Sequence, residues 1–370
     1  MRKAPNPSRI QLARKRRGLT KVTLEQRVGI SAKTLGDYEK GRAIPTEDAL
    51  ESIASVLRFP VMFFYRADLQ EPKEDGVSFR SLSTMRAGQR DAALAAGALA
   101  FELSTWIDTE FELETPDLLD LREYDPAQAA VMLRNYWGYG VRPVGNMIHL
   151  LESKGVRVFS LAERGRQIDA FSLWYQDAPF VFLNTMKTVE HSRMDAAHEL
   201  GHLVLHRHGA IRGRDVESDA KTFAAEFLMP RDSVIGVVPR LTGPSMPTLA
   251  QLKRNWGVSL ATLAMRLNKL GLLPDHSYRV ICIELSKYGR TREPNPIAER
   301  ETSAVLAKVF DMLRETGMTK ADVAKKLDLY TEDLDALIFG LGQMALSEAQ
   351  GHASPDAEAE ARRRQFKVYM

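Results

Sequence analysis

Apolar residues recur at helical intervals over the first 66 residues and predict a series of short helices. Glycines at positions 18, 29 and 41 separate four or five such segments, and Thr20 and Ser31 stand where the N-caps of the second and third helices would lie. Two short helices joined by a tight turn at Gly29 are typical of a helix-turn-helix arrangement. We therefore expect a small all-helical domain at this end of the chain.

The rest of the chain has a mixed pattern that predicts a small sheet among helices. The pattern predicts, in order, a long helix at 93–113, a helix at 131–140, a helix and a strand within 147–161, two strands within 171–184, a strand at 278–285, helices at 301–341 and a polar tail at 347–365. The long helix is expected to be a spacer between domains. The expected fold class is α+β, mostly α.

The segment MDAAHELGHLVLHRHG contains His198, Glu199 and His202 in the order HExxH. On a helix, residues i and i+4 lie one turn apart on the same face, so the two imidazoles can bind one zinc ion. Glu199 lies beside them and is the candidate general base. Apolar residues flank the motif and predict a buried helix, in which a glutamate is costly unless it has a function or a partner. The motif therefore predicts a catalytic Zn²⁺ site.

A catalytic zinc usually has three protein ligands, and the candidates for the third are His206, His208, Glu217, Asp219 and Glu226. His206 is eight residues from His198, a rise of about 12 Å, which is too far for both to bind one ion. In the following segment, ESDAKTFAAEFLMP, Glu217 opens the apolar face of a helix. Asp219 and Glu226 lie roughly 180–200° away around that helix and are expected to face solvent. Glu217 is the predicted third ligand.

Charge is distributed unevenly along the chain. Residues 1–66 hold 14 Lys and Arg against 6 Asp and Glu, a net charge of +8, whereas the whole chain carries +3 and the remainder therefore carries −5. This asymmetry indicates that the first segment contacts a polyanion, with a solvated surface as the alternative.

The single cysteine, Cys282, excludes a disulfide within the chain and any cysteine-based zinc finger. No run of about 18 apolar residues occurs, and the basic N-terminus lacks the apolar stretch of a signal peptide. We expect a cytoplasmic protein that does not enter a membrane.

Residues 14–64 resemble the lambda-repressor-like (XRE) DNA-binding domain over its full length. The matching residues are Arg14, Gly18, Leu19, Thr20, Leu24, Gly29, Ser31, Tyr38, Glu39, Gly41, Pro45, Leu50, Ala54 and Leu57. The resemblance implies a five-helix helix-turn-helix domain over residues 1–68 that binds a double-stranded DNA operator. By analogy with the family, we expect a homodimer on a palindromic site.

In such a domain the third helix presents its N-terminal residues to base edges in the major groove. The candidates for reading bases are Ala32, Lys33, Thr34 and Asp37. The candidates for phosphate contacts, which fix the register without reading sequence, are Arg14, Lys15, Arg16, Lys21, Lys40 and Arg42.

The segment around the HExxH motif resembles the ImmA/IrrE family of zinc metallopeptidases. The resemblance rests on HELGHLVLH, on the downstream ESDAKTFAAEFLMP, and on PFVFLN and LKRNWGVSLATLAMRLNKLGLL to either side. It carries the zinc ligands onto His198, His202 and Glu217 and the general base onto Glu199. It implies a zincin-like peptidase domain at 131–275, with a helical linker at 69–130 and a mainly helical C-terminal region and polar tail at 276–370.

The fused layout resembles bacterial, plasmid or phage regulators, whose relatives cleave helix-turn-helix repressors under stress or act as antitoxin-like regulators. One hypothesis is a DNA-binding transcription regulator with an active zinc peptidase that hydrolyses a repressor- or antitoxin-like protein. The alternative is a transcription factor whose peptidase fold senses a ligand or partner without proteolysis. A third, an antitoxin that neutralises a toxin, is compatible with either. The intact ligands and Glu199 favour hydrolysis, because a sensor needs no base beside the metal.

Overall fold

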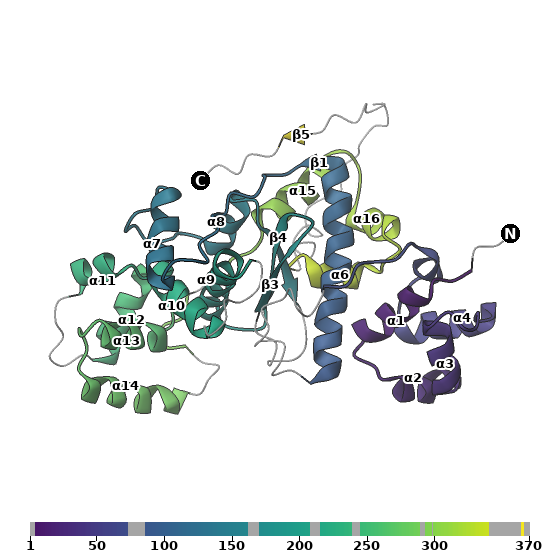
Figure 1. The fold of residues 1–370 in the computed structure, drawn as a ribbon, viewed down its shortest axis with the longest axis horizontal. Coiled ribbons are helices and arrows are strands. Elements are labelled where there is room, and N and C mark those ends of the chain that lie inside the picture. The colour runs from purple at the N-terminus through teal and green to yellow at the C-terminus, as the bar shows by residue number, and fades with distance from the viewer. Residues whose placement is uncertain are drawn as a thin grey trace.

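The computed structural model describes residues 4–72, 86–161, 170–207, 215–238, 245–288, 293–297, 299–339 and 364–365. These ranges are mostly helical around a small sheet, as the sequence predicted. The helix-turn-helix unit lies at one end of an elongated molecule, with the sheet in the middle (Figure 1). Among these residues, no helix combines the length and apolarity needed to cross a lipid bilayer.

The N-terminal domain contains α1 (Pro7–Arg16), α2 (Lys21–Val28), α3 (Ala32–Glu39), α4 (Glu47–Leu57) and the 3₁₀ helix η1 (Val61–Tyr65). The predicted caps are confirmed: the side chain of Thr20 accepts from the Thr23 N–H, and that of Ser31 from the Thr34 N–H. Gly29 ends α2 with φ of 71°, in the left-handed region that favours glycine. The fifth expected helix is the short 3₁₀ helix η1.

The three-stranded sheet has the order β2-β4-β3, formed by β2 (Arg157–Leu161), β3 (Ala170–Tyr175) and β4 (Ala178–Asn184). β4 pairs parallel with β2 and antiparallel with β3. Because side chains alternate along a strand, the two faces bury different residues. Phe159, Phe171 and Phe182 belong to one core, and Val158 and Val181 to the other. The sheet is thus buried on both faces and joins the two cores.

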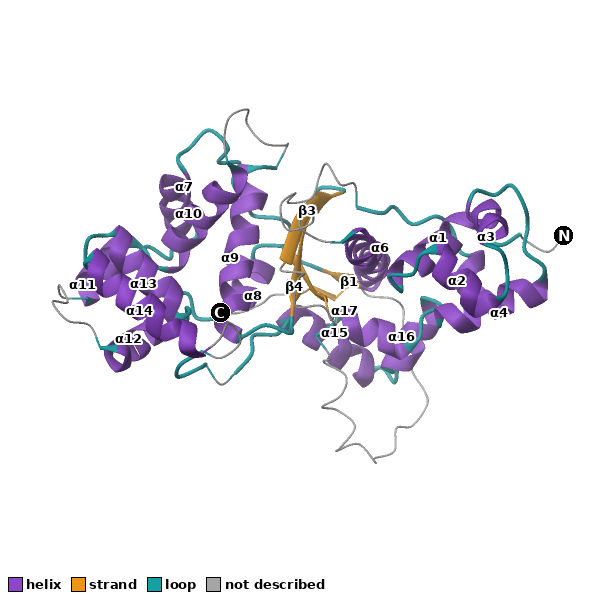
Figure 2. Cartoon of the chain, turned by 90° about the horizontal axis from the view of Figure 1, so that it is seen from below, coloured by secondary structure: helices purple, strands orange, loops and turns teal. Residues whose placement is uncertain are grey.

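Helices cover both faces of this sheet (Figure 2). One face packs on the long helix α6 (Ala87–Glu110), and the other on α8 (Met147–Ser153) and α9 (Val189–Leu205). The remaining helices on the α9 side are α7 (Pro126–Tyr136), α10 (Val216–Leu228), α11 (Arg231–Val237), α12 (Met246–Leu252), η3 (Lys253–Asn255), α13 (Leu260–Lys269) and α14 (Asp275–Tyr288). Pro126 occupies the first turn of α7, where its missing N–H has no cost.

The expected long helix is confirmed as α6, and it is a core element rather than a free spacer. Its alanine-rich middle is buried, and Phe101 stacks on Tyr175 of β3 with ring centroids 4.0 Å apart. At Gly97 a Cβ would lie 2.8 Å from Cγ of Pro72, so only glycine lets the preceding segment cross the helix this closely.

The strand expected at 278–285 is wrong: these residues lie within α14. A short apolar run fits either period, because Tyr278, Ile281 and Leu285 also stand at i, i+3 and i+7. In the structure these three side chains pack on the core, while Val280 and Ile283 are exposed. The burial of this segment therefore follows the period of an α-helix and not the alternation of a β-strand.

The C-terminal helices α15 (Ala304–Glu315), α16 (Lys320–Lys326) and α17 (Thr331–Leu337) connect the sheet with the N-terminal domain. The Ser160 hydroxyl of β2 donates to the Ala336 carbonyl of α17 at 2.7 Å. A last short pair, β1 (Phe111–Glu112) with β5 (Arg364–Gln365), is parallel.

Ion pairs dock the N-terminal domain on α6 and on the C-terminal helices. Arg17 binds Asp333 through Nη1 and Nη2 at 2.6 and 2.8 Å, and Arg9 binds Glu102 of α6 at 2.9 and 3.1 Å. Arg66 bridges Glu102 and Asp328, with 2.9 Å to each. Part of the positive charge expected to face a polyanion therefore pairs with carboxylates of the same chain.

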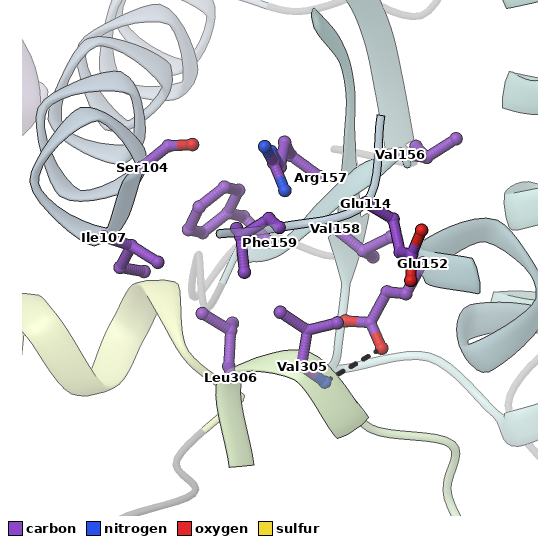
Figure 3. A pocket seen from close by; sticks show the side chains of 11 residues that line it. Ser104, Ile107, Glu114, Glu152, Val156, Arg157, Val158, Phe159, Val305 and Leu306 are labelled. Atoms are coloured by element: carbon purple, nitrogen blue, oxygen red, sulfur yellow. Dashed lines mark hydrogen bonds between the residues drawn. The ribbon is translucent and has the colours of Figure 1, made fainter. Parts of the chain in front are cut away.

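A buried carboxylate joins α15 to α8. Glu152, at the end of α8, accepts the N–H groups of Ala304 at 2.9 Å and Val305 at 3.2 Å and also contacts the Ser303 hydroxyl. Figure 3 shows its hydrogen bond with Val305. Burial raises the pKa of Glu152 to about 7, although these three donors favour the ionised form. The first N–H groups of every helix lack a partner within the helix, and the Glu152 carboxylate supplies the acceptor for those of α15.

This joint predicts a pH dependence of stability. Between about pH 4.5 and 7 the unfolded chain ionises Glu152 while the folded protein still holds its proton, so stability falls as pH rises through this window. Glu152→Gln removes the titration but keeps an acceptor. We expect urea unfolding to show that the wild type loses on the order of 3 kcal/mol relative to Glu152→Gln between pH 4 and 8. Equal pH profiles for the two proteins would contradict this account.

Candidate metal centre and nucleic-acid surface

Helices α9 and α10 bring the predicted metal ligands together. The Thr188 side chain caps α9, and the Asp215 carboxylate caps α10 by accepting the N–H groups of Glu217 and Ser218. At the crossing, a Cβ on Gly201 would lie 3.1 Å from the Phe223 ring and 3.3 Å from Cα of Ala220. The absence of a side chain at Gly201 thus lets α10 approach α9 closely enough for Glu217 to reach the histidines.

The side chains of His198, His202 and Glu217 converge, with one ligand atom from each within 4.8 Å of the others. The two Nε2 atoms are 3.1 Å apart, His198 Nε2 is 3.4 Å from Glu217 Oε2, and His202 Nε2 is 3.5 Å from Glu217 Oε1. His202 and Glu217 are buried. The side chain that the sequence analysis selected as the third ligand therefore lies beside those of the two histidines.

The electrostatics of the cluster favour an ionised carboxylate between the two imidazoles. Burial alone would raise the pKa of Glu217, but the two histidines outweigh it and hold that pKa well below its usual range. Burial would likewise lower the pKa of His198, and Glu217, Glu199 and Asp195 outweigh it and raise that pKa.

The residues present fit a zinc ion. Two imidazole nitrogens and one carboxylate are a donor set that zinc uses in catalytic sites, whereas calcium and magnesium prefer oxygen ligands alone. Glu217 Oε1 is buried and has no hydrogen-bond partner among the described residues, which is costly for a carboxylate oxygen unless a cation lies beside it. His198, His202 and Glu217 would hold the ion.

Glu199 is almost completely buried, at 2% exposure, and Ser172 of β3 contacts it. The Ser172 hydroxyl lies 2.7 Å from Glu199 Oε2 and 3.2 Å from the Glu199 carbonyl oxygen. Sequence reasoning missed Ser172. The sequence feature that could have identified it is the alternation of side chains along the strand. This alternation places Ser172 on the face opposite Phe171 and Leu173, toward α9.

The other candidates for the third ligand have different positions. His206 Nδ1 lies 3.0 Å from His202 Nδ1, on the side of that imidazole away from Glu217, and Asp219 is half-buried. The expectation that Glu226 faces solvent is wrong: it is buried, accepts the Arg231 N–H at 2.8 Å and pairs with Arg266 of α13. Arg266 lies on α13, so the periodicity of α10 alone could not reveal its ion pair with Glu226. His208 lies outside the described residues.

Several predicted DNA contacts lie on or beside α3. Lys33, Lys40 and Arg42 are exposed, and Ala32 and Thr34 are half-buried in the first turn of α3. Asp37 lies 3.3 Å from Arg42. Lys21 Nζ lies 3.5 Å from Glu39, while Lys15 pairs with Glu71 at 2.7 Å and Arg16 is half-buried. The start of α3 is therefore accessible for recognition.

Arg14 is a correction to the predicted phosphate contacts. Its Nε and Nη2 bind the Glu39 carboxylate at 2.5 and 2.9 Å, and its Nη1 donates to the Leu19 carbonyl at 2.8 Å. Both partners of the ion pair are buried. A guanidinium engaged in this way cannot also bind a phosphate, so Arg14 instead holds α1 against α3.

Comparison with known families agrees with this geometry. Residues 10–64 match the family model described as helix-turn-helix, and residues 151–268 match the peptidase family model described as the IrrE N-terminal-like domain. The second match covers β2, β3 and β4 and the two helices, α9 and α10, that carry the candidate metal ligands. No curated protein is a significant match to the chain.

The ligand geometry predicts one zinc ion per purified chain. His202→Ala leaves two ligands, too few for tight binding, and we expect it to lose most of the metal. His191→Ala, at an exposed histidine in the first turn of the same helix, is the matched control and should keep its zinc. Elemental analysis of the dialysed proteins measures the content. Full zinc content in His202→Ala would show that the site is assigned incorrectly.

Proposed function

We propose that this chain, which carries a helix-turn-helix domain and an IrrE N-terminal-like domain, is a transcription regulator whose second domain is a zinc-dependent peptidase. It would bind a DNA operator and hydrolyse a repressor- or antitoxin-like protein in the cytoplasm. The observation that carries the proposal is the position of Glu199 on α9, adjacent in sequence to His198, in a helix whose two histidines meet Glu217.

When bound, zinc supplies a Lewis acid that polarises a water molecule or the scissile carbonyl oxygen. The protein must supply the proton acceptor, and Glu199, the carboxylate of the HExxH motif, acts on the charge of His198 and is not one of the three candidate ligands. Ser172 donates a hydrogen bond to Glu199 Oε2 and fixes its orientation. As water attacks the carbonyl, Glu199 takes a proton and returns it to the leaving amine.

The edge of the sheet offers a path for an extended peptide. Within the described residues β3 pairs with β4 alone, so its other edge has backbone groups that a substrate strand can bind. Ser172 lies in this strand, so a peptide along the edge would run beside Glu199. The far edge, β2, is tied to α17 through the bond from Ser160 to Ala336. This arrangement supports a protein substrate cleaved in an unfolded or locally unfolded segment.

One feature favours a second candidate function, in which the peptidase fold senses a ligand without proteolysis. A cleft of about 580 Å³ lies away from the metal ligands, between the start of α9, the η3 turn and the segment before α15. Arg193, Arg254 and Arg300 are among its lining residues. Its volume is in the range of small-molecule sites. The two candidates differ in their need for Glu199.

Glu199→Gln distinguishes them. Glutamine keeps the shape and the hydrogen bond with Ser172 but cannot take up a proton, so we expect normal zinc content, normal DNA binding and cleavage slowed by about 10²-fold or more. The assay follows cleavage of proteins encoded beside this gene, with Glu315→Gln, at an exposed glutamate, as the control. If the substrate were cut at the wild-type rate by Glu199→Gln, the peptidase mechanism would be wrong. If Glu199→Gln also left regulation in cells unchanged, the sensor function would replace the peptidase function.

DNA binding should show two classes of residue. Lys33→Ala, at the start of α3, is expected to change sequence preference, whereas Lys40→Ala should weaken all sites alike and reduce the salt dependence of binding by about one phosphate contact. Lys269→Ala, an exposed lysine on α13, is the control. Fluorescence anisotropy against selected operators at several salt concentrations measures both effects. A truncated chain lacking residues 1–66 that bound DNA as tightly as the full chain would refute the assignment.

A further inference from the structure

His206 stands one helical turn beyond His202, at the end of α9. Its backbone N–H still bonds the His202 carbonyl at 2.9 Å, so it keeps the i, i+4 relation to His202 although its φ of −131° already leaves the helix. The imidazoles of His202 and His206 are tilted by 50°, and their Nδ1 atoms are 3.0 Å apart. This contact lies on the side of His202 opposite the one that faces His198 and Glu217.

The convergence of the ligands decides which nitrogen of His202 carries its proton. Nε2 faces His198 Nε2 at 3.1 Å and Glu217 Oε1 at 3.5 Å, so its lone pair must point into the cluster to bind a cation. A neutral imidazole then carries its proton on Nδ1 and requires an acceptor there. Within hydrogen-bond distance of His202 Nδ1, the described residues place the Nδ1 of His206.

We propose that His206 is a positioning residue for the metal centre, which accepts the Nδ1–H of His202 and so fixes the tautomer and the ring orientation of that ligand. The inference rests on the proposed zinc site. In most metalloproteins a carboxylate or a carbonyl oxygen accepts this proton, and here a neutral imidazole does so. His206 is too far along α9 to bind the ion together with His198, so it acts through His202 alone.

Two neighbouring contacts hold the end of α9 in place. Trp174 Nε1 of β3 donates to the Leu203 carbonyl at 3.1 Å, and the Arg207 guanidinium lies over the Trp174 ring at 3.7 Å from its centre. His202 itself is buried, at 6% exposure. With the helix end fixed by these contacts, changing the His206 side chain removes the acceptor without freeing the backbone that positions His202.

The test compares two substitutions by competitive zinc titration of the full chain against a chromophoric chelator. His206→Leu removes the acceptor, whereas His206→Asn places Oδ1 where Nδ1 stands now. We expect the zinc Kd to rise 10- to 100-fold in His206→Leu, the usual cost of losing such a partner, and to stay within about threefold in His206→Asn. His191→Leu should match the wild type. With cobalt in place of zinc, the visible spectrum should change only in His206→Leu.

Equal zinc affinity in His206→Leu and the wild type would overturn the inference, and so would an equal loss in His206→Leu and His206→Asn, because a merely structural role gives no rescue by an acceptor. Thermal unfolding of the metal-free proteins shows whether His206→Leu folds. If it does not fold, His206→Asn decides: tight zinc binding by this variant supports the inference, and weak zinc binding overturns it. A wild-type chain that binds no zinc would instead overturn the proposed function, which keeps the two failures distinct.

Discussion

The burial of three ionisable side chains on and beside one helix is the constraint on which the site depends. Glu199, His202 and Glu217 have almost no exposure, and such groups are costly to bury without partners. Each element around α9 supplies one: β3 brings Ser172 to Glu199, α10 brings Glu217 to the histidines, and the end of α9 brings His206 to His202. A cation between these three side chains would complete the set, because it would compensate the Glu217 oxygen that has no hydrogen-bond partner among the described residues.

The doubly buried sheet links this centre to the DNA-binding domain. One face packs on α9, and the other, rich in phenylalanine, packs on α6, which in turn holds the N-terminal domain through the pair of Glu102 with Arg9. The C-terminal helices add a second link, from Glu152 and Ser160 on the peptidase side to Arg17 and Arg66 on the other. The described residues therefore form a connected body in which the start of α3 remains exposed.

The sequence was most informative where local geometry decides the structure. The i, i+4 spacing of His198 and His202 and the apolar face that selects Glu217 need only the period of a helix, and the N-caps need only their own side chains. Partners that arrive from distant elements were invisible: Arg266 reaches Glu226, Glu39 reaches Arg14, and strand pairing sets Ser172 beside Glu199. The helix at 278–285 was misjudged because a short apolar run fits both periods until its packing is known.

The most direct test of the account is X-ray absorption at the zinc edge on the full-length protein, compared with Glu217→Gln. We predict a first shell of two imidazole nitrogens and light oxygen donors at about 2.0–2.2 Å without sulfur, and loss of metal or a changed shell when Glu217 is replaced. The exposed Cys282 on α14 makes the contrast clear, because zinc bound at that thiolate would show sulfur at about 2.3 Å. A sulfur-containing shell, or an identical shell in Glu217→Gln, would contradict the assignment of the metal centre.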